Sequence, residues 1–408
     1  MRILFFNQYF PPEITAGAMR AQGFTAGLER LGHEVHVVCE VPSHPAGVVA
    51  PGYGGHLIQR RRRAGLTVDY VWVRATPSQS LSARLVNYGS YALSAAVAGV
   101  RAPRPDVVLA SSPPPTVGSV GSLLARRHGV PWVLDIRDLW PDAAVALGQV
   151  EEGALVKATR RLERGLYRSA AAITTTTRPF ADSIAARGGE GKLTVIPNGT
   201  AHVFLETGGS EPDRGLLGGE DDDSFRWTYA GNIGLVAGLE CAIEAARELG
   251  SGYRLTLIGD GRRRPHLRAL AGDLPPGQVR FVDPVPPPEA ARMMRASDAL
   301  LVTRAPNPGL DAMVLAKLYD CCAVARPVIV SAAGETSRLA DEAGAALCVP
   351  PGDASALAAA IRRLREDTPL RERLARAGRS FAEDNTRERG AQRLERILAE
   401  AAGAGRRD

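Results

Sequence analysis

The chain has 408 residues, 45% of them hydrophobic and 23% charged, which is the composition of an ordinary soluble globular protein with at least two domains. The formal net charge of +6 permits anionic partners such as nucleotides or acidic lipid headgroups but selects none of them. Residues 60–63 (RRRR) are the one dense basic run, and no aromatic residues interleave with it. A solvated loop is favoured there over a nucleic-acid surface, so we expect no nucleic-acid partner.

The cysteines argue against disulfide bonds and zinc, because their number is odd, none form a CxxC pair and most lie in apolar runs. Reduced core thiols and a cytoplasmic location are therefore expected. The first residues, MRILFF, enter a strand directly and lack the pattern of a signal peptide. The uncharged run 85–100 is too short to span a bilayer and is read as a packed helix. The run 107–125 is interrupted by three prolines and is read as a strand, a turn and a helix. The cysteines are Cys39, Cys241, Cys321, Cys322 and Cys348.

Apolar runs and helical periodicity alternate through the first 200 residues. Residues 2–6 predict a buried strand, 17–31 a helix that ends before Gly32, and 35–39 a second strand. This order is a βαβ unit of the doubly wound kind, although its glycines do not match the GxGxxG dinucleotide pattern. Further strands are expected at 66–73, 106–110, 132–135, 171–175 and 193–196, and further helices at 81–97, 117–127, 155–167 and 178–186.

The loop over residues 135–142 (DIRDLWPD) is a candidate site because it follows a strand of this sheet. Ligands in open α/β sheets bind beyond the carboxyl ends of the strands, and this loop offers acids, an arginine and a tryptophan. The alternative is structural: Arg137 pairs with Asp135 or Asp138, and Trp140 fills the domain.

A second alternation follows a polar stretch. Residues 206–224 are rich in Gly, Glu and Asp, which predicts a linker or mobile insertion. The expected organisation is a first domain at 1–200, a linker at 201–224 and a second domain at 225–386, with a last helix at about 387–403 packing back on the first domain. Two Rossmann-like domains that face each other create a cleft, the default ligand site. Strands of the second domain are expected at 226–230, 254–258, 279–282, 299–302, 327–330 and 346–349.

The stretch 303–327 carries the strongest local signal in the second domain. A turn-rich loop precedes a helix expected to open near residue 315, and Lys317 and Asp320 lie three residues apart on one helix face. A helix N-terminus can seat a diphosphate, and a carboxylate one turn further in can accept two hydrogen bonds from a ribose diol. Lys317 is one of only three lysines in the chain. The alternative is an ordinary exposed helix start.

Several motifs in the same order resemble one family over nearly the whole chain. They are FNQYFPPE, DIRDLWPD, VIPNG, YAGNIGL, LIGDG and AKLYD with ARPVI. Together they resemble the retaining glycosyltransferases of the GT-B fold, glycosyltransferase family four, and within them the fucosyl- and N-acetylfucosaminyl-transferase types of bacterial polysaccharide assembly. The resemblance implies an α/β fold with two Rossmann-like domains across a cleft, a nucleotide-sugar donor on the second domain and an acceptor on the first.

The resemblance also implies a role for individual residues. Asp320 takes the place of the ribose-binding acid, usually Glu, and Lys317 with the backbone of Leu315 and Ala316 would sit at the diphosphate. Val285 would contact the base through its backbone. The other implied positions are Gly231 and Asn232 as the second wall of the phosphate site, Gly17 near the diphosphate or sugar, and Asp138, the catalytic candidate, at the reacting centre.

The implied chemistry is attack by the acceptor on the face that the nucleotide leaves, without a bound metal or other cofactor. Helix N-termini and cations can stabilise the leaving nucleoside diphosphate. Residues 220–223 (EDDD) contain DxD spacing, but a solvated acidic run is favoured there. Relatives often have Pro-Ser-Lys where this chain has Leu315–Ala316–Lys317, and cations after the first strand of the second domain. Arg304 is the candidate substitute for those cations.

The sequence leaves several functions open. The leading one is a transferase that uses a UDP- or GDP-sugar, with a lipid-linked saccharide or a small natural product as acceptor. A lipid-linked acceptor would suit peripheral contact with the inner face of a membrane. The altered donor motif also allows a catalytically silent partner of another transferase. A sugar-nucleotide epimerase shares the architecture but would need acids and histidines in the cleft.

Overall fold

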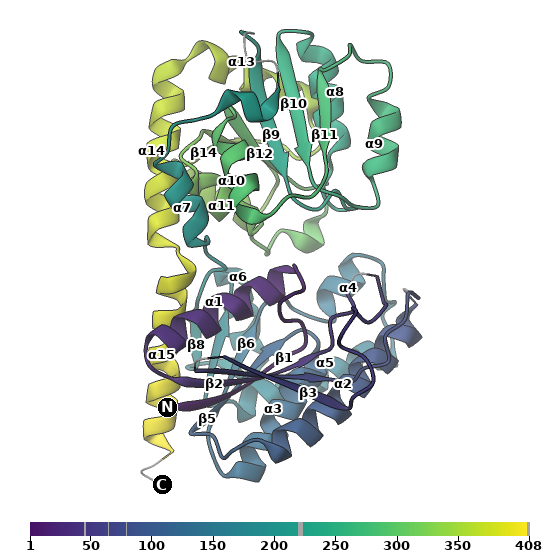
Figure 1. The fold of residues 1–408 in the computed structure, drawn as a ribbon, viewed down its shortest axis with the longest axis vertical. Helices are drawn as coiled ribbons and strands as arrows, with labels where there is room; N and C mark the ends of the chain where they lie inside the picture. Colours follow the sequence, from purple (N-terminus) through teal and green to yellow (C-terminus); the bar gives the residue numbers. More distant parts are fainter. Residues whose placement is uncertain (45, 64, 79, 219–222, 406–408) are drawn as a thin grey trace. The chain divides into compact units, whose positions relative to one another are not determined.

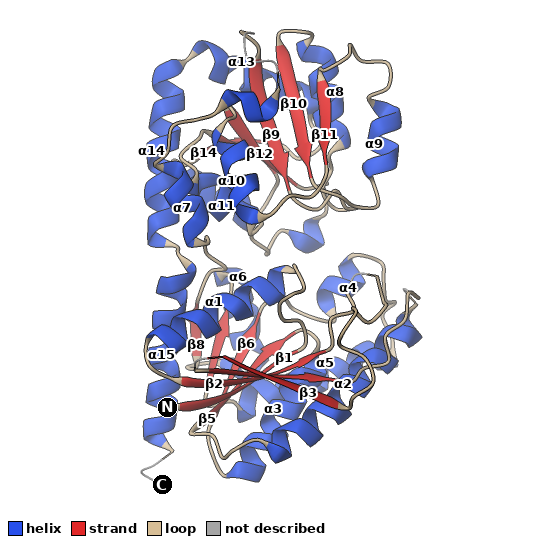
Figure 2. Ribbon diagram, in the orientation of Figure 1, coloured by secondary structure: helices blue, strands red, loops and turns tan. Residues whose placement is uncertain are grey.

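The computed structural model describes residues 1–44, 46–63, 65–78, 80–218 and 223–405 (Figure 1). The chain divides into two compact units, Met1–Pro197 with Arg387–Asp408, and Asn198–Thr386. In each unit the strands gather into a central sheet with helices around it (Figure 2). The α/β, two-Rossmann-like fold expected from the sequence is confirmed.

The first unit holds an eight-stranded sheet in the order β3-β4-β2-β1-β5-β6-β7-β8. All neighbours pair in parallel except β3 and β4, which form an antiparallel hairpin at one edge. Because both faces of the sheet are covered, its central strands are continuous apolar runs. The strands are β1 (Arg2–Asn7), β2 (Glu34–Glu40), β3 (Ile58–Arg63), β4 (Leu66–Val71), β5 (Val107–Ser112), β6 (Trp132–Ile136), β7 (Ala172–Thr175) and β8 (Leu193–Val195).

The hairpin corrects one sequence expectation. The basic run 60–63 is part of β3 and not a solvated loop. Arg60 donates to both carboxylate oxygens of buried Asp69 on β4, and the Arg61 guanidinium lies 4.0 Å from the centre of the Tyr53 ring. The arginines therefore tie an edge strand to the sheet.

The helices of the first unit include the last helix of the chain. In α1 the Thr15 hydroxyl accepts a hydrogen bond from the Ala18 N–H, which caps the helix. The Cβ of Ala391 lies 2.2 Å from where a Cβ on Gly27 would be, so α1 and α15 pack closely because residue 27 has no side chain. The helices are α1 (Ala16–Arg30), α2 (Leu81–Arg101), α3 (Pro115–His128), α4 (Asp142–Ala146), α5 (Ala154–Ser169), α6 (Arg178–Ile184) and α15 (Arg387–Ala404).

The second unit holds a parallel six-stranded sheet in the order β11-β10-β9-β12-β13-β14. This is the doubly wound order in which the chain reverses direction across the sheet between β9 and β12. Its strands are β9 (Phe225–Ala230), β10 (Tyr253–Ile258), β11 (Val279–Val282), β12 (Ala299–Thr303), β13 (Val328–Ser331) and β14 (Ala346–Val349). Its helices are α7 (His202–Gly208), α8 (Glu240–Leu249), α9 (Arg264–Leu270), α10 (Pro287–Arg295), α11 (Lys317–Ala323), α12 (Glu335–Glu342), α13 (Ala354–Glu366) and α14 (Thr368–Asp384).

The expected linker at 201–224 is wrong over its first part. Residues 202–208 form α7, which packs on α10, α11 and α14, and Leu205 joins the core of the second unit. A 3-10 turn, Arg214–Leu217, buries Leu217 on the same unit. Residues 220–222 of the acidic run lie outside the described residues.

The cysteines are all free, and four of the five are buried in the two cores. Among the helices of the described chain, none combines the length and the apolar character needed to cross a bilayer.

Candidate functional site

The switch point of the second sheet lies between β9 and β12. Gly231 follows β9, Gly259 follows β10, and Arg304 follows β12, so three loops leave neighbouring strands at one edge of the sheet. Ligands of doubly wound sheets bind outside the carboxyl ends of the strands at such a point. The donor-binding residues predicted from the sequence mostly belong to these loops and to α11.

The side chain of Lys317 reaches back to the end of β9. Its Nζ lies 3.6 Å from the centre of the Tyr229 ring, a cation–π contact. Tyr229 is held in turn by the core around it and by its hydroxyl, which donates to the Asn232 carbonyl at 2.7 Å. Burial lowers the pKa of Lys317 to about 7, since desolvation penalises the charged form. The structure thus places a partly buried, readily titrated amine at the switch point.

Gly231 must be glycine for two reasons. Its φ is 142°, which residues with a side chain rarely adopt, and a Cβ there would lie 3.1 Å from Lys317 Nζ. On the next loop, a Cβ on Gly259 would lie 2.1 Å from the Gly231 carbonyl oxygen. The two loops therefore approach each other through backbone atoms alone. Because residue 231 has no side chain, it does not cover the Lys317 amine. Asn232 is exposed beside them.

Asp320 lies one turn after Lys317 in α11 and is partly buried. Its Oδ1 accepts a hydrogen bond from the Thr200 hydroxyl at 2.8 Å. Thr200 is itself fixed by its N–H, which donates to the Asn385 carbonyl at 2.9 Å. The carboxylate is therefore oriented by a segment 120 residues away in the sequence.

The start of α11 differs from the sequence expectation. The helix begins at Lys317, with Ala316 as its N-cap and no side-chain cap, instead of near residue 315. The Leu315 N–H donates to the Thr336 hydroxyl at 3.1 Å and is not available to a diphosphate. The expected role of the Leu315 amide is corrected on this ground. Ala316 and Lys317 remain at the first turn, where backbone N–H groups have no partner within the helix.

Arg304 does not serve as the substitute cation that the sequence suggested. Only 3% of the residue is exposed. Its guanidinium donates to the Leu310 carbonyl at 2.7 Å, to the Ala333 carbonyl at 3.0 Å and to Asp311 at 3.2 Å. Burial lowers its pKa. Arg304 therefore fixes the loop that leads to α11 and acts on the site only through that loop.

Val285 lies in the loop between β11 and α10. Its side chain packs against a small apolar cluster that includes Ile258 and Leu217. This packing fixes the loop and leaves contact through the backbone as its possible interaction with a base, which stays a prediction.

In the first unit, Gly17 and Arg137 are in direct contact. A Cβ on Gly17 would lie 1.7 Å from Arg137 Nη1, so the guanidinium occupies the space that a side chain would fill. Arg137 Nη2 donates to the Pro113 carbonyl at 2.7 Å, while its Nε is buried without a partner among the described residues. Burial lowers the pKa of Arg137. Gly17, the second residue of α1, thus lies against a buried cation on the residue that follows β6.

Asp138 follows Arg137, and its Oδ1 is buried with no hydrogen-bond partner among the described residues. Burial raises the pKa of Asp138. The structural alternative for Arg137, a pair with Asp135, is wrong: Asp135 pairs with Arg20 at 2.8 Å. Burial opposes ionisation of Asp135, but the Arg20 charge and hydroxyl hydrogen bonds hold its pKa below the usual range. Asp138 thus keeps one buried carboxylate oxygen unsatisfied among the described residues, and its role at the reacting centre stays a prediction.

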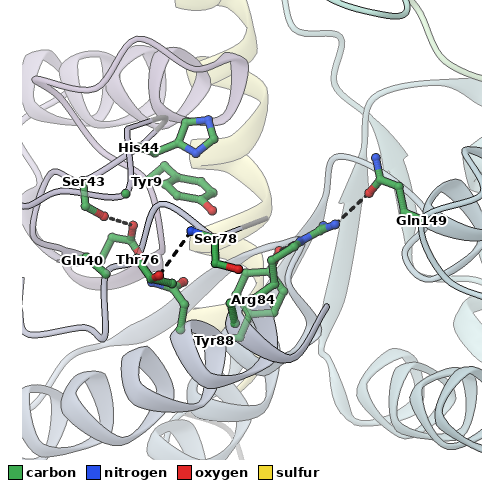
Figure 3. A pocket seen from close by; sticks show the side chains of 13 residues that line it. Tyr9, Glu40, Ser43, His44, Thr76, Ser78, Arg84, Tyr88 and Gln149 are labelled. Carbon is green, nitrogen blue, oxygen red and sulfur yellow. Dashed lines mark hydrogen bonds between the residues drawn. The ribbon is translucent and has the colours of Figure 1, made fainter. Parts of the chain in front are cut away.

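A polar cavity of about 300 Å³ lies beside the ends of β1, β2 and β4 (Figure 3). Glu40 forms part of its wall, 3% exposed, and accepts hydrogen bonds from Gln8 at 2.6 Å and from Ser43 at 3.2 Å. Burial raises the pKa of Glu40 to about 8. The lining of the cavity also includes Tyr9, His44, Thr76, Ser78, Arg84, Asn87, Tyr88 and Gln149.

Several of these residues were missed from the sequence. Tyr229, Thr200 and Thr336 act through side chains that meet α11 only in the fold. Glu40 had a readable signal, because an acid that ends a buried apolar strand points to the ligand edge of the sheet.

Two family models cover most of the chain. A glycosyl transferase 4-like domain matches residues 15–199, and a glycosyl transferases group 1 domain matches residues 225–367. The chain belongs to the family-four-like GT-B glycosyltransferases. The resemblance read from the motifs is thereby confirmed, and the epimerase alternative is set aside.

Relatives of this glycosyltransferase cover most of its length. The putative colanic acid biosynthesis glycosyl transferase WcaI of Escherichia coli K12 is 26% identical over 375 residues, 89% of this chain and 91% of its own. Sucrose-phosphate synthase from Thermosynechococcus elongatus has the same fold, with a TM-score of 0.76 and 17% identity over 99% of both chains. Anabaena HepE in complex with UDP-glucose matches with a TM-score of 0.70 and 16% identity over 98% of this chain and 100% of its own.

Proposed function

We propose that this glycosyltransferase is a retaining hexosyltransferase that uses a UDP- or GDP-sugar as donor and a lipid-linked saccharide or a small natural product as acceptor, without a metal ion. The observation that carries the proposal is Lys317, held over Tyr229 beside the side-chain-free loop at Gly231. A cation at the switch point of a doubly wound sheet suits the diphosphate of a nucleotide sugar. A structural neighbour solved with UDP-glucose, and a full-length relative named for colanic acid biosynthesis, support the donor and acceptor classes.

Lys317 would stabilise the leaving nucleoside diphosphate. In the reaction a bond forms between the acceptor atom and the anomeric carbon while the bond between that carbon and the phosphate oxygen breaks. The electron pair of the broken bond leaves with the diphosphate, which also takes up the proton that the acceptor atom loses. A lysine of pKa about 7 is only half protonated at neutral pH, but an adjacent phosphate favours the ammonium form. Binding of the donor therefore favours protonation of Lys317, and the resulting ammonium group stabilises the leaving diphosphate. The amide groups at Ala316 and Lys317, with Gly231 and Asn232, would complete the diphosphate site.

Asp320 would accept the two ribose hydroxyls, with Thr200 fixing the carboxylate. The backbone at Val285 would contact the base. In the first unit, Asp138 would accept a hydrogen bond from the reacting groups, and Gly17 would admit the donor close to the Arg137 guanidinium. Attack on the face that the nucleotide leaves preserves the anomeric configuration without a protein nucleophile.

The test is release of nucleoside diphosphate from a panel of UDP-, GDP- and TDP-sugars, with and without EDTA. We expect turnover with one base, unaffected by EDTA, and a product whose anomeric configuration matches the donor by NMR. Asp320→Ala should raise the donor KM by about tenfold or more because two hydrogen bonds are lost. If no donor binds or turns over, and Asp320→Ala leaves the activity of a partner transferase intact, the protein is a silent subunit and the proposal fails.

A further inference from the structure

The helix α2 of the first unit presents an apolar stripe that its own unit leaves uncovered. Leu93 is 74% exposed, Val86 55% and Val100 54%. Positions 86, 93, 97 and 100 recur at intervals of seven, four and three residues, which places them on one face of the helix. Leu85 lies eight residues before Leu93 and extends the same stripe. The opposite face of the helix packs on the sheet through Tyr91, which is fully buried, so the stripe is not part of the core.

The surface around the stripe is basic. The 21 residues of α2 include no Asp or Glu, with Arg84 near its start and Arg101 at its end. The helix α3, which packs on α2, also contains no Asp or Glu. It exposes Leu123 and, one turn later, the basic pair Arg126 and Arg127. An apolar face bordered by arginines and free of acids complements the surface of an anionic bilayer.

The same helix lines the polar cavity. Arg84, Asn87 and Tyr88 come from its first two turns and line the cavity. Figure 3 shows Arg84 and Tyr88 there. The Arg84 guanidinium donates to neutral groups, the Gln149 side-chain oxygen at 2.8 Å and the Tyr88 hydroxyl at 3.3 Å, and no carboxylate of the described residues pairs with it. The opening turns of α2 thus belong to the cavity, and its outward face belongs to the apolar stripe.

We propose that α2 docks on an anionic lipid bilayer through Leu85, Val86, Leu93, Val97 and Val100, and that the acceptor is an amphiphilic saccharide embedded in that bilayer. The acceptor part rests on the proposed function. A docked α2 places the polar cavity at the lipid surface, where the headgroup of a lipid-linked acceptor lies. A soluble acceptor would require none of these exposed apolar side chains. A second copy of the chain fits less well, because a symmetric contact between two α2 helices would bring arginines of both copies together.

The experiment is co-sedimentation of the full chain with vesicles, and it requires no donor. We expect binding to vesicles of phosphatidylglycerol and phosphatidylethanolamine to exceed binding to phosphatidylcholine vesicles by about tenfold. Leu93→Glu should lower binding to the anionic vesicles by about tenfold or more, because a carboxylate enters the centre of the stripe. The matched control is Leu31→Glu, 45% exposed at the end of α1. Helix α1 covers the other face of the same sheet from α2 (Figure 1), so this variant should bind as the unchanged protein does.

Equal binding of the unchanged protein and Leu93→Glu, or equal binding to both kinds of vesicle, would overturn the inference. So would light scattering that shows a dimer which Leu93→Glu splits, together with no vesicle binding. Circular dichroism melts of both variants distinguish loss of docking from loss of the fold. Failure of the donor panel leaves vesicle binding untouched, and full turnover with a water-soluble acceptor without vesicle binding overturns only the lipid-surface inference.

Discussion

The polar cavity of the first unit and the switch point of the second unit are built around buried groups of different kinds. In the second unit a lysine lies over an aromatic ring beside loops that approach with backbone only. In the cavity of the first unit the buried group is a carboxyl, Glu40, surrounded by amide and hydroxyl groups. A cation beside bare backbone suits a compact anion, whereas a carboxyl that favours its protonated form and accepts hydrogen bonds from neutral groups suits hydroxyls. One fold therefore supports two recognition chemistries through different loops.

The largest expected effect comes from removing the cation. Lys317→Met keeps the length and apolar stem of the side chain but cannot be charged, so we expect kcat/KM for the donor to fall by about 100- to 1,000-fold. The measurement is steady-state release of nucleoside diphosphate. Lys157→Met, on the exposed surface of α5, is the matched control and should stay within about twofold. If kcat/KM fell in both variants, or in neither, the assignment of the Lys317 cation to the donor site of the second unit would be contradicted.

The titration of Lys317 gives the next effect. Its pKa of about 7 in the free protein rises when a diphosphate binds, so binding takes up a proton above pH 7. Donor affinity should therefore fall by up to about tenfold per pH unit between pH 7 and 9, and calorimetry in buffers of different ionisation enthalpy should show proton uptake. Affinity that does not change over this range would place the ammonium away from the phosphates.

The carboxyl of the first unit should make the stability of the fold, not donor affinity, fall as pH rises. The pKa of Glu40 is raised from its usual range to about 8, so the folded protein holds this proton more tightly than the unfolded chain. Its stabilising contribution is complete below about pH 4.5 and is lost as pH rises through 8. Glu40→Gln should thus raise Tm by at least about 4 °C at pH 8.5 and by less at pH 5. Calorimetry at both pH values measures this, and an equal shift at both would contradict the assignment.

The smallest effect concerns the start of α11. Ala316→Ser introduces a hydroxyl at an N-cap that has no side-chain cap. We expect a gain of about 1 kcal/mol or less in stability, and donor affinity changed by no more than about fivefold. Thermal melts and nucleotide titrations measure both quantities. A change of affinity far beyond that range would mean that the hydroxyl contacts the donor directly.

The sequence predicted the framework of the fold well. The alternation of apolar runs and helical periodicity located every strand of the two sheets except β3, and Lys317 and Asp320 share the helix on which they were expected. Local patterns are sufficient to locate strands and helices because the periodicity of each element depends on residues close together in the sequence.

What the sequence did not predict depends on distant partners. Arg304 ends a strand at the ligand edge, but the carbonyl groups that bind it belong to loops whose paths only the fold defines. The Leu315 amide is occupied by Thr336, 21 residues later. Helix α7 shows the same limit. It begins a stretch that is largely polar, so the sequence did not indicate a short helix whose few apolar residues reach the core.

The first unit is discontinuous in sequence, because Arg387–Asp408 belongs to it and the whole second unit lies between its parts. During synthesis, every residue of the second unit has left the ribosome before α15 can reach the Gly27 surface of α1. The second unit can therefore fold first and the first unit is completed last. A chain that is truncated after residue 386 and released should contain a protease-resistant second unit and a first unit that is still readily cleaved.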